Sequence, residues 1–113
     1  MERGDVVWVD FGSPRGSEPA KRRPAIVVQD NWLLASDVAT VLVVPLTSNL
    51  DLEPFPGNAL VPSVASGLTR DSVAVVSQLG PVSREFIDPF AVGTLPPYLL
   101  AKVSAGIRLV AGL

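Results

Sequence analysis

Two short, valine-rich apolar runs constrain the fold of this chain more than any other feature. They are PAIVVQ at residues 24–29 and TVLVVPL at residues 40–46. β-branched side chains lose rotamer freedom in a helix and pack well on a pleated sheet. Nearly continuous apolar runs of this length are typical of strands that are buried on both faces. The sequence therefore predicts a sheet with these two strands at its centre.

The rest of the chain predicts further short strands separated by turns. DVVWVDF at residues 5–11 alternates, with Val7, Val9 and Phe11 on one side, and both Trp8 and Phe11 are expected to pack in the core. Further strands are expected at residues 59–63 and 71–83, the latter broken near Gly80 and Pro81. Residues 12–23 and 47–58 read as loops, and residues 30–37 as a short helical turn.

The C-terminal segment has the periodicity of a helix. Thr94 is a candidate N-cap, and the prolines that follow it suit a first helical turn. Four apolar residues then recur at helical spacing: Leu99, Val103, Ile107 and Val110. With 113 residues, the chain is expected to form one domain over residues 1–113. The predicted class is β-rich α+β, a small curved antiparallel barrel with a C-terminal helix packed on it.

Composition excludes several kinds of chemistry. The chain has no cysteine and no histidine, so thiol catalysis, disulfides, zinc–thiolate sites and histidine acid–base catalysis are ruled out. Its net charge of −2 argues against holding nucleic acid by bulk electrostatics. The N-terminus resembles no signal peptide and no run is long enough to span a membrane, so we expect a soluble cytoplasmic protein.

The basic residues are unevenly distributed. Of nine lysines and arginines, five fall in the first 23 positions: Arg3, Arg15, Lys21, Arg22 and Arg23. The cluster KRR precedes a predicted strand, and Pro24 biases Arg23 toward an extended backbone. A fixed guanidinium at a strand end suits a phosphate, whereas a solvated loop is the plain alternative.

Four segments of the chain together resemble the MazF/PemK (Kid) family of bacterial toxin endoribonucleases. They are RGDVVWVDF at 3–11, GSEPAKRRPAIVVQ at 16–29, VVPLTSN at 43–49 and RDSVAVVSQLGPVS at 70–83. The resemblance implies an SH3-like barrel, a homodimer and sequence-specific cleavage of single-stranded RNA without a metal or other cofactor. It also implies neutralisation by a cognate MazE-like antitoxin, whose acidic, partly disordered tail would suit a cationic groove.

The resemblance also implies roles for individual residues. Arg23 and Thr47 match the family's catalytic positions, and Glu18 is a candidate to orient Arg23 or to help the 2′-hydroxyl lose its proton. Candidate RNA-binding residues, which would hold phosphates or bases, are Ser17, Lys21, Arg22, Asn49 and Gln78. Trp32, Phe55 and the two long loops are candidates for reading unstacked bases.

One part of the family pattern is missing. Where the Kid branch has an Arg/Asp pair, this chain has Val75 and Ser77, so the chemistry would depend on Arg23 and Thr47.

Three alternatives remain open at this point. A CcdB-like gyrase poison has the same kind of barrel, but such toxins end in Trp-Gly-Ile, whereas this chain ends VAGL. A non-catalytic SH3-like module would bind RNA or peptide without cleavage. A metal-dependent nuclease is disfavoured because Asp5, Asp10 and Glu18 do not form a recognisable ligand set.

Overall fold

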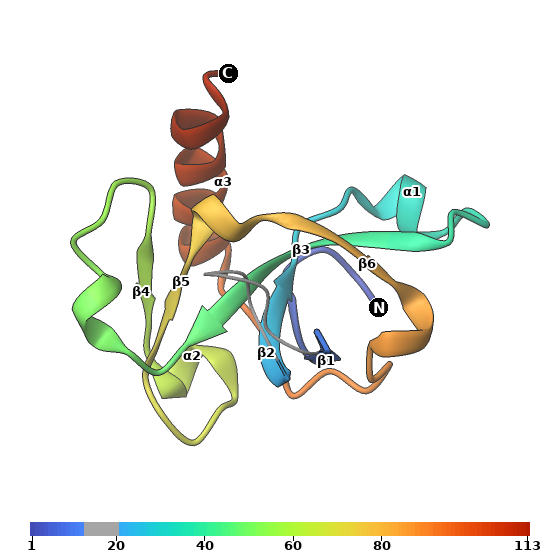
Figure 1. Ribbon diagram of the computed structural model, residues 1–113, viewed down its shortest axis with the longest axis horizontal. Coiled ribbons are helices and arrows are strands. Elements are labelled where there is room, and N and C mark those ends of the chain that lie inside the picture. The colour runs from blue at the N-terminus through green and yellow to red at the C-terminus, as the bar shows by residue number, and fades with distance from the viewer. Residues whose placement is uncertain (13–20) are drawn as a thin grey trace.

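A strongly curled antiparallel sheet and one long helix form the framework of the molecule (Figure 1). The computed structural model describes residues 1–12 and 21–113. The strands are β1 (Asp5–Asp10), β2 (Arg22–Val27), β3 (Thr40–Thr47), β4 (Ala59–Val61), β5 (Ser72–Ala74), β6 (Gly80–Ser83) and β7 (Gly93–Thr94). The α-helices are α1 (Asn31–Leu34), α2 (Ser63–Ser66) and α3 (Pro97–Ala111), and single 3₁₀ turns lie at Leu50–Leu52, Val76–Gln78 and Arg84–Phe86.

Strand β3 organises the sheet. The strand order is β4-β5-β3-β2-β1-β7, and β6 pairs with β3 as well. The first half of β3 pairs with β6, and its last two residues, Leu46 and Thr47, pair with β5. Because β3 has neighbours along both edges, its apolar sequence is buried as predicted, from Val43 to Leu46. The sheet curls into a half-barrel, which confirms the predicted fold class.

The core lies on both faces of the sheet. Alternation sends Val6, Ile26 and Val44 to one cluster, and Val7 and Val27 to the other. Each fully buried aliphatic side chain contributes about 1.5–3 kcal/mol of transfer free energy. Two-sided burial of β1, β2 and β3 explains why their sequences are almost continuously apolar.

Helix α3 covers the first of these clusters with Leu99 and Val103. Its N-cap is Pro96 rather than Thr94, which corrects the sequence prediction. Thr94 belongs to β7, and its hydroxyl donates a hydrogen bond of 2.9 Å to the Asp5 carboxylate. The predicted apolar face also ends early, because Val110 is 46% exposed.

The predicted strand at 71–83 is two strands. It breaks at residues 75–79, before Gly80, and the 3₁₀ turn Val76–Gln78 separates β5 from β6. The turn redirects the chain so that β5 reaches the end of β3 and β6 reaches its beginning. Helix α2 was not predicted, and it follows directly after β4.

Candidate active site

A pocket of about 600 Å³ opens at the edge of the sheet where β2 begins and β3 ends. One wall is residues 21–24, the floor is residues 46–48, and a second wall is residues 67–70 with Ser72. Trp8 and Val92 complete the lining. The pocket therefore joins three segments that are far apart in the sequence.

Strand register explains why Arg23 and Thr47 come together. In the antiparallel pair of β2 and β3, Ala25 lies opposite Pro45, Ile26 opposite Val44 and Val27 opposite Val43. Each pair of numbers sums to 70, so extending the register by two residues places Arg23 opposite Thr47. Directly opposite residues project from the same face of a sheet, with Cα atoms about 5 Å apart. Both predicted catalytic residues line the pocket.

The pocket is strongly cationic. Four basic residues line it: Lys21, Arg22, Arg23 and Arg70. No residue among the described lining carries a carboxylate. A one-signed cleft with low-dielectric walls focuses its field, so this part of an acidic chain attracts anions.

Arg22 is held in place on two sides. Its guanidinium carbon lies 4.9 Å from the centroid of the Trp8 ring, and Nη2 lies 3.6 Å from the Asp88 carboxylate. The ion pair is solvent-exposed and worth little, so the arrangement matters more for orientation than for stability. Trp8 itself is half-buried and lines the pocket, which corrects the expectation that it packs in the core. It lies opposite Pro24 near the end of β1, where the sheet borders the pocket.

The hydroxyl of Thr47 has one local partner. Thr47 Oγ1 accepts a hydrogen bond of 3.2 Å from the Asn49 backbone N–H. Accepting that bond leaves the O–H free to donate, since a hydroxyl has one donor hydrogen and two lone pairs. The geometry therefore presents a donor to any oxyanion bound between Thr47 and Arg23.

Lys21 has the only positive φ of a non-glycine residue in the described chain, 60°. Its backbone closes the base of the β1–β2 hairpin, because its carbonyl accepts a hydrogen bond of 2.8 Å from the Phe11 N–H. A left-handed conformation at a non-glycine residue costs of order 1 kcal/mol, and such strain clusters at functional sites.

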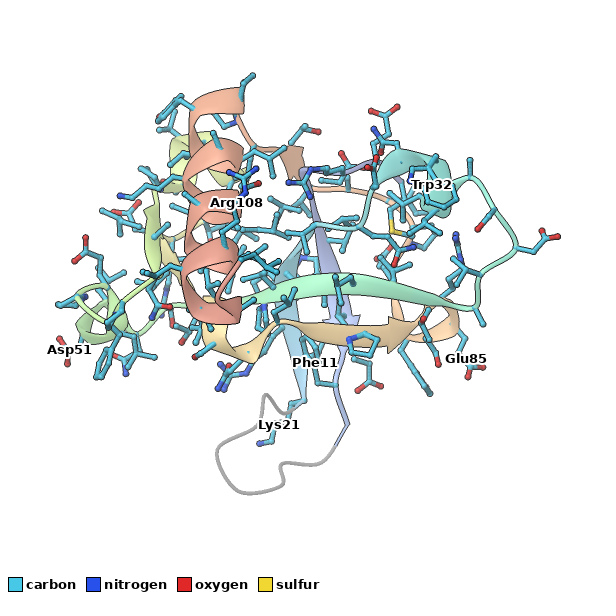
Figure 2. The ribbon with its side chains drawn as sticks, turned by 90° about the horizontal axis from the view of Figure 1, so that it is seen from above. Phe11, Lys21, Trp32, Asp51, Glu85 and Arg108 are labelled. Carbon is cyan, nitrogen blue, oxygen red and sulfur yellow. The ribbon has the colours of Figure 1, made fainter. Side chains whose placement is uncertain are left out.

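Other predicted site residues lie elsewhere. Asn49 and Gln78 do not line the pocket; the Asn49 side chain caps the turn Leu50–Leu52 by accepting from the Asp51 N–H at 3.2 Å. Trp32 and Phe55 are exposed and also outside the pocket, and Figure 2 shows Trp32 on α1, away from Lys21 at the start of β2. Ser17 and Glu18 lie outside the described residues.

Sequence reasoning missed several lining residues, chiefly Trp8, Ser48, Arg70 and Ser72. Arg70 and Ser72 belong to the segment RDSV that carries part of the family resemblance. The signal that could have identified Arg70 is its place just before β5, the strand that pairs with Thr47.

Two further findings concern the described residues only. No group of three or more histidine, cysteine, aspartate or glutamate residues is placed to hold a metal ion within residues 1–12 and 21–113. In the same residues, no helix has both the length and the apolar character needed to cross a membrane.

Comparison with known proteins identifies the family. Residues 2–111 match the profile of the PemK-like, MazF-like toxins of type II toxin–antitoxin systems. Endoribonuclease MazF2 of Mycobacterium bovis is 38% identical over 110 residues, which cover 97% of this chain and 96% of that protein. Endoribonuclease toxin MazF of Escherichia coli K12 is 32% identical over 111 residues, covering 98% and 94%.

Solved structures show the same fold. MazF from Deinococcus radiodurans superposes with a TM-score of 0.83 at 20% identity, covering 100% of this chain and 97% of that one. The Mycobacterium tuberculosis toxin MazF-mt6 gives a TM-score of 0.79 at 15% identity, covering 96% and 97%. With its curled sheet, its terminal helix and a profile match along nearly its whole length, the chain belongs to the PemK-like, MazF-like toxin family.

Proposed function

We propose that this protein, acting as a single domain over residues 1–113, is an endoribonuclease toxin that cleaves single-stranded RNA without a metal ion. The observation that carries the proposal is that Arg23 and Thr47 line one cationic pocket, just beyond the end of the β2–β3 pairing. The relatives named as endoribonucleases MazF support it at the level of the whole chain.

The reaction needs no nucleophile from the protein. The 2′-oxygen of the RNA attacks the adjacent phosphorus, a P–O bond forms, and the bond to the 5′-oxygen of the next nucleotide breaks. The products are a 2′,3′-cyclic phosphate and a 5′-hydroxyl. The 2′-hydroxyl loses one proton and the 5′-oxygen gains one, so no water or oxidant is consumed.

The protein's task is then to stabilise charge on the five-coordinate phosphorus. The fork of Arg23 matches two phosphate oxygens, and a guanidinium stays charged at all working pH values. The Thr47 hydroxyl supplies a further donor. Where the Kid branch has its Arg/Asp pair, this chain has Val75, which is buried, and Ser77, which is exposed but does not line the pocket, so neither replaces the pair. Glu18 remains the candidate to assist the proton of the 2′-hydroxyl.

Partners follow from the same proposal. We expect the protein to form a homodimer in the cytoplasm and to be neutralised by a MazE-like antitoxin. A mycobacterial endoribonuclease of the same fold was solved with its cognate antitoxin, with a TM-score of 0.74 at 18% identity. An acidic segment is the natural ligand of a pocket lined by four cations.

The test is cleavage of a mixed-sequence single-stranded RNA in EDTA, with fragment ends identified by mass spectrometry. Wild-type protein is expected to give cyclic-phosphate ends, and Arg23→Ala to lower kcat by about 10²–10³-fold. Arg23→Lys keeps the charge but loses the fork, so it should restore only part of the rate. Lys102→Ala, on the exposed face of α3, removes the same charge outside the pocket and should cut normally.

Other outcomes decide against the proposal. A folded wild-type protein that binds RNA without cutting it would favour a binding module. Inhibition of gyrase with no effect on RNA would favour the CcdB-like alternative. Equal cleavage by wild type and Arg23→Ala would remove Arg23 from the chemistry.

A further inference from the structure

Arg70 is a cation of the pocket that the proposed chemistry does not use. It lies on the second wall, on a different segment from the KRR cluster. The described chain gives it no hydrogen bond and no ion pair, and its side chain is exposed. Its neighbour Asp71 forms no ion pair with it within the described residues, and Asp71 Oδ1 accepts from the Ser63 N–H at 2.8 Å.

The backbone that carries Arg70 is fixed rather than loose. Gly67 and Gly93 pack so closely that a Cβ on Gly67 would lie 2.2 Å from the Val92 carbonyl oxygen. Ser66 Oγ accepts from the Leu68 N–H at 3.0 Å, just before the wall begins. Two residues beyond Arg70, Ser72 starts β5, whose Val73 lies opposite Thr47. The backbone of Arg70 is therefore held at a set position relative to the floor of the pocket.

A single RNA strand carries one negative charge for each nucleotide. If Arg23 and Thr47 hold the reacting phosphate, the neighbouring phosphate of the strand must lie at or near the second wall of the pocket. Arg22 already stacks on Trp8 and pairs with Asp88. Arg70, on the other wall, has no ion pair or hydrogen bond within residues 1–12 and 21–113, and its planar fork suits a phosphate.

We propose that Arg70 binds a phosphate that flanks the reacting one and so holds the RNA strand across the pocket. This inference rests on the proposed function for its substrate, single-stranded RNA. It assigns Arg70 to binding and register, not to the bond-breaking step. Removing it is expected to raise KM and to leave kcat nearly unchanged.

The first experiment measures binding without cleavage. The probe is a fluorescent single-stranded RNA of randomised sequence with 2′-O-methyl groups, which cannot react. The dissociation constant is measured across a range of salt concentrations for wild type, Arg70→Ala, Arg70→Lys and Lys102→Ala. One lost phosphate contact lowers the slope of log K against log salt by about 0.7 for a single strand.

Arg70→Ala is expected to show that lower slope and about tenfold weaker binding at low salt. Arg70→Lys should keep the wild-type slope, and Lys102→Ala should change neither quantity. Because Arg70 is exposed and makes no bond within the described chain, the melting temperature of Arg70→Ala should match wild type. An unchanged slope in Arg70→Ala would overturn the assignment.

The second experiment uses cleavable RNA and locates the phosphate. Once the wild-type cut site is mapped, neutral methylphosphonates are placed singly on each side of it. At one flanking position, the effects of the methylphosphonate and of Arg70→Ala on KM should be non-additive, because both changes remove the same contact. A fall in kcat with no change in KM would place Arg70 in the transition state and contradict the proposal.

The two proposals fail in different ways. In one case, the wild-type protein binds RNA with a salt slope that depends on Arg70 and yet fails to cleave it. That result would contradict the proposed function and support this inference. If Arg70→Ala has the same kinetics and the same salt slope as a wild-type protein that cleaves RNA, this inference is contradicted and the proposed function stands.

Discussion

At the scale of single residues, Thr47 has both a structural and a proposed catalytic role. It is the last residue of β3, and its side chain accepts a hydrogen bond from the Asn49 N–H that starts the following turn. The same oxygen carries the hydrogen that points toward a bound phosphate in the proposed reaction. One atom therefore links the end of the strand to the site, and the two roles are measured separately as kcat and the free energy of unfolding.

Thr47→Val keeps the shape of the side chain and removes the hydroxyl. We expect kcat to fall by about 10²-fold, as for the loss of one oxyanion donor. The lost bond to Asn49 should lower the free energy of unfolding by about 1 kcal/mol. Single-turnover cleavage and urea unfolding measure the two effects. Thr47→Ser retains the hydroxyl and should recover most of the rate; a Thr47→Val enzyme with wild-type kcat would contradict the role.

Four residues singled out from the sequence line the pocket, namely Lys21, Arg22, Arg23 and Thr47, and the catalytic roles of Arg23 and Thr47 stay predictions. Arg23 and Thr47 were recognisable because each stands at the end of an apolar run, in a segment that resembles the family. Trp8 and Arg70 were not, because nothing in an alternating strand or in a loop indicates which side faces a pocket. Asn49 and Gln78 show the converse: a polar residue near the right strand end also suits a local cap or turn.

At the scale of elements, two glycines set the position of the second wall. A Cβ on Gly93 would lie 2.3 Å from the Ser66 carbonyl oxygen, so β7 and the segment after α2 approach as bare backbones. Gly67, with φ +82°, also turns the chain out of α2 in a conformation that other residues rarely adopt. The wall that carries Arg70 depends on this contact.

Gly93→Ala should therefore separate the two backbones. We expect a loss of about 1–3 kcal/mol in the free energy of unfolding, typical of overpacking, together with a higher KM for RNA because the wall moves. Urea unfolding and steady-state cleavage report the two quantities. Gly80→Ala is the matched control, since its Cβ would meet nothing closer than 3.8 Å and should be tolerated. Equal stability of the two variants would refute the expectation.

Element types were predictable where local pattern decides them, and boundaries were not. The apolar runs gave the central strands, and the 3.6-residue period gave the last helix. The division of residues 71–83 into two strands depends on which part of β3 each half meets, a long-range pairing that no local window contains. Thr94 failed as an N-cap for the same reason, since its hydroxyl is used by Asp5, far away in the sequence.

At the scale of the whole molecule, large apolar side chains remain exposed on a single chain. Leu109, in the last turn of α3, is 65% exposed, Leu113, which follows the end of the helix, is 89% exposed, and Trp32 on α1 is 71% exposed. Large apolar side chains left exposed on one chain are candidates for a contact with a second copy. It is consistent with the proposed homodimer.

Sedimentation equilibrium of the purified protein tests this directly. We expect a mass twice that of the 11.9 kDa chain, independent of salt if the contact is apolar. A dimer that dissociates only when salt is raised would point to charged contacts instead. A mass of one chain at micromolar concentration would exclude the homodimer.

The position of β3 also bears on how such a site changes during evolution. Thr47 ends the strand most of whose other residues are buried in the core, so substitutions in the floor of the pocket risk the fold itself. The walls, residues 21–24 and 67–70, contain most of the exposed residues that line the pocket. Divergence toward new RNA sequences is therefore expected to accumulate in the walls, apart from Arg23, while the floor stays constant, which would let one scaffold support many specificities.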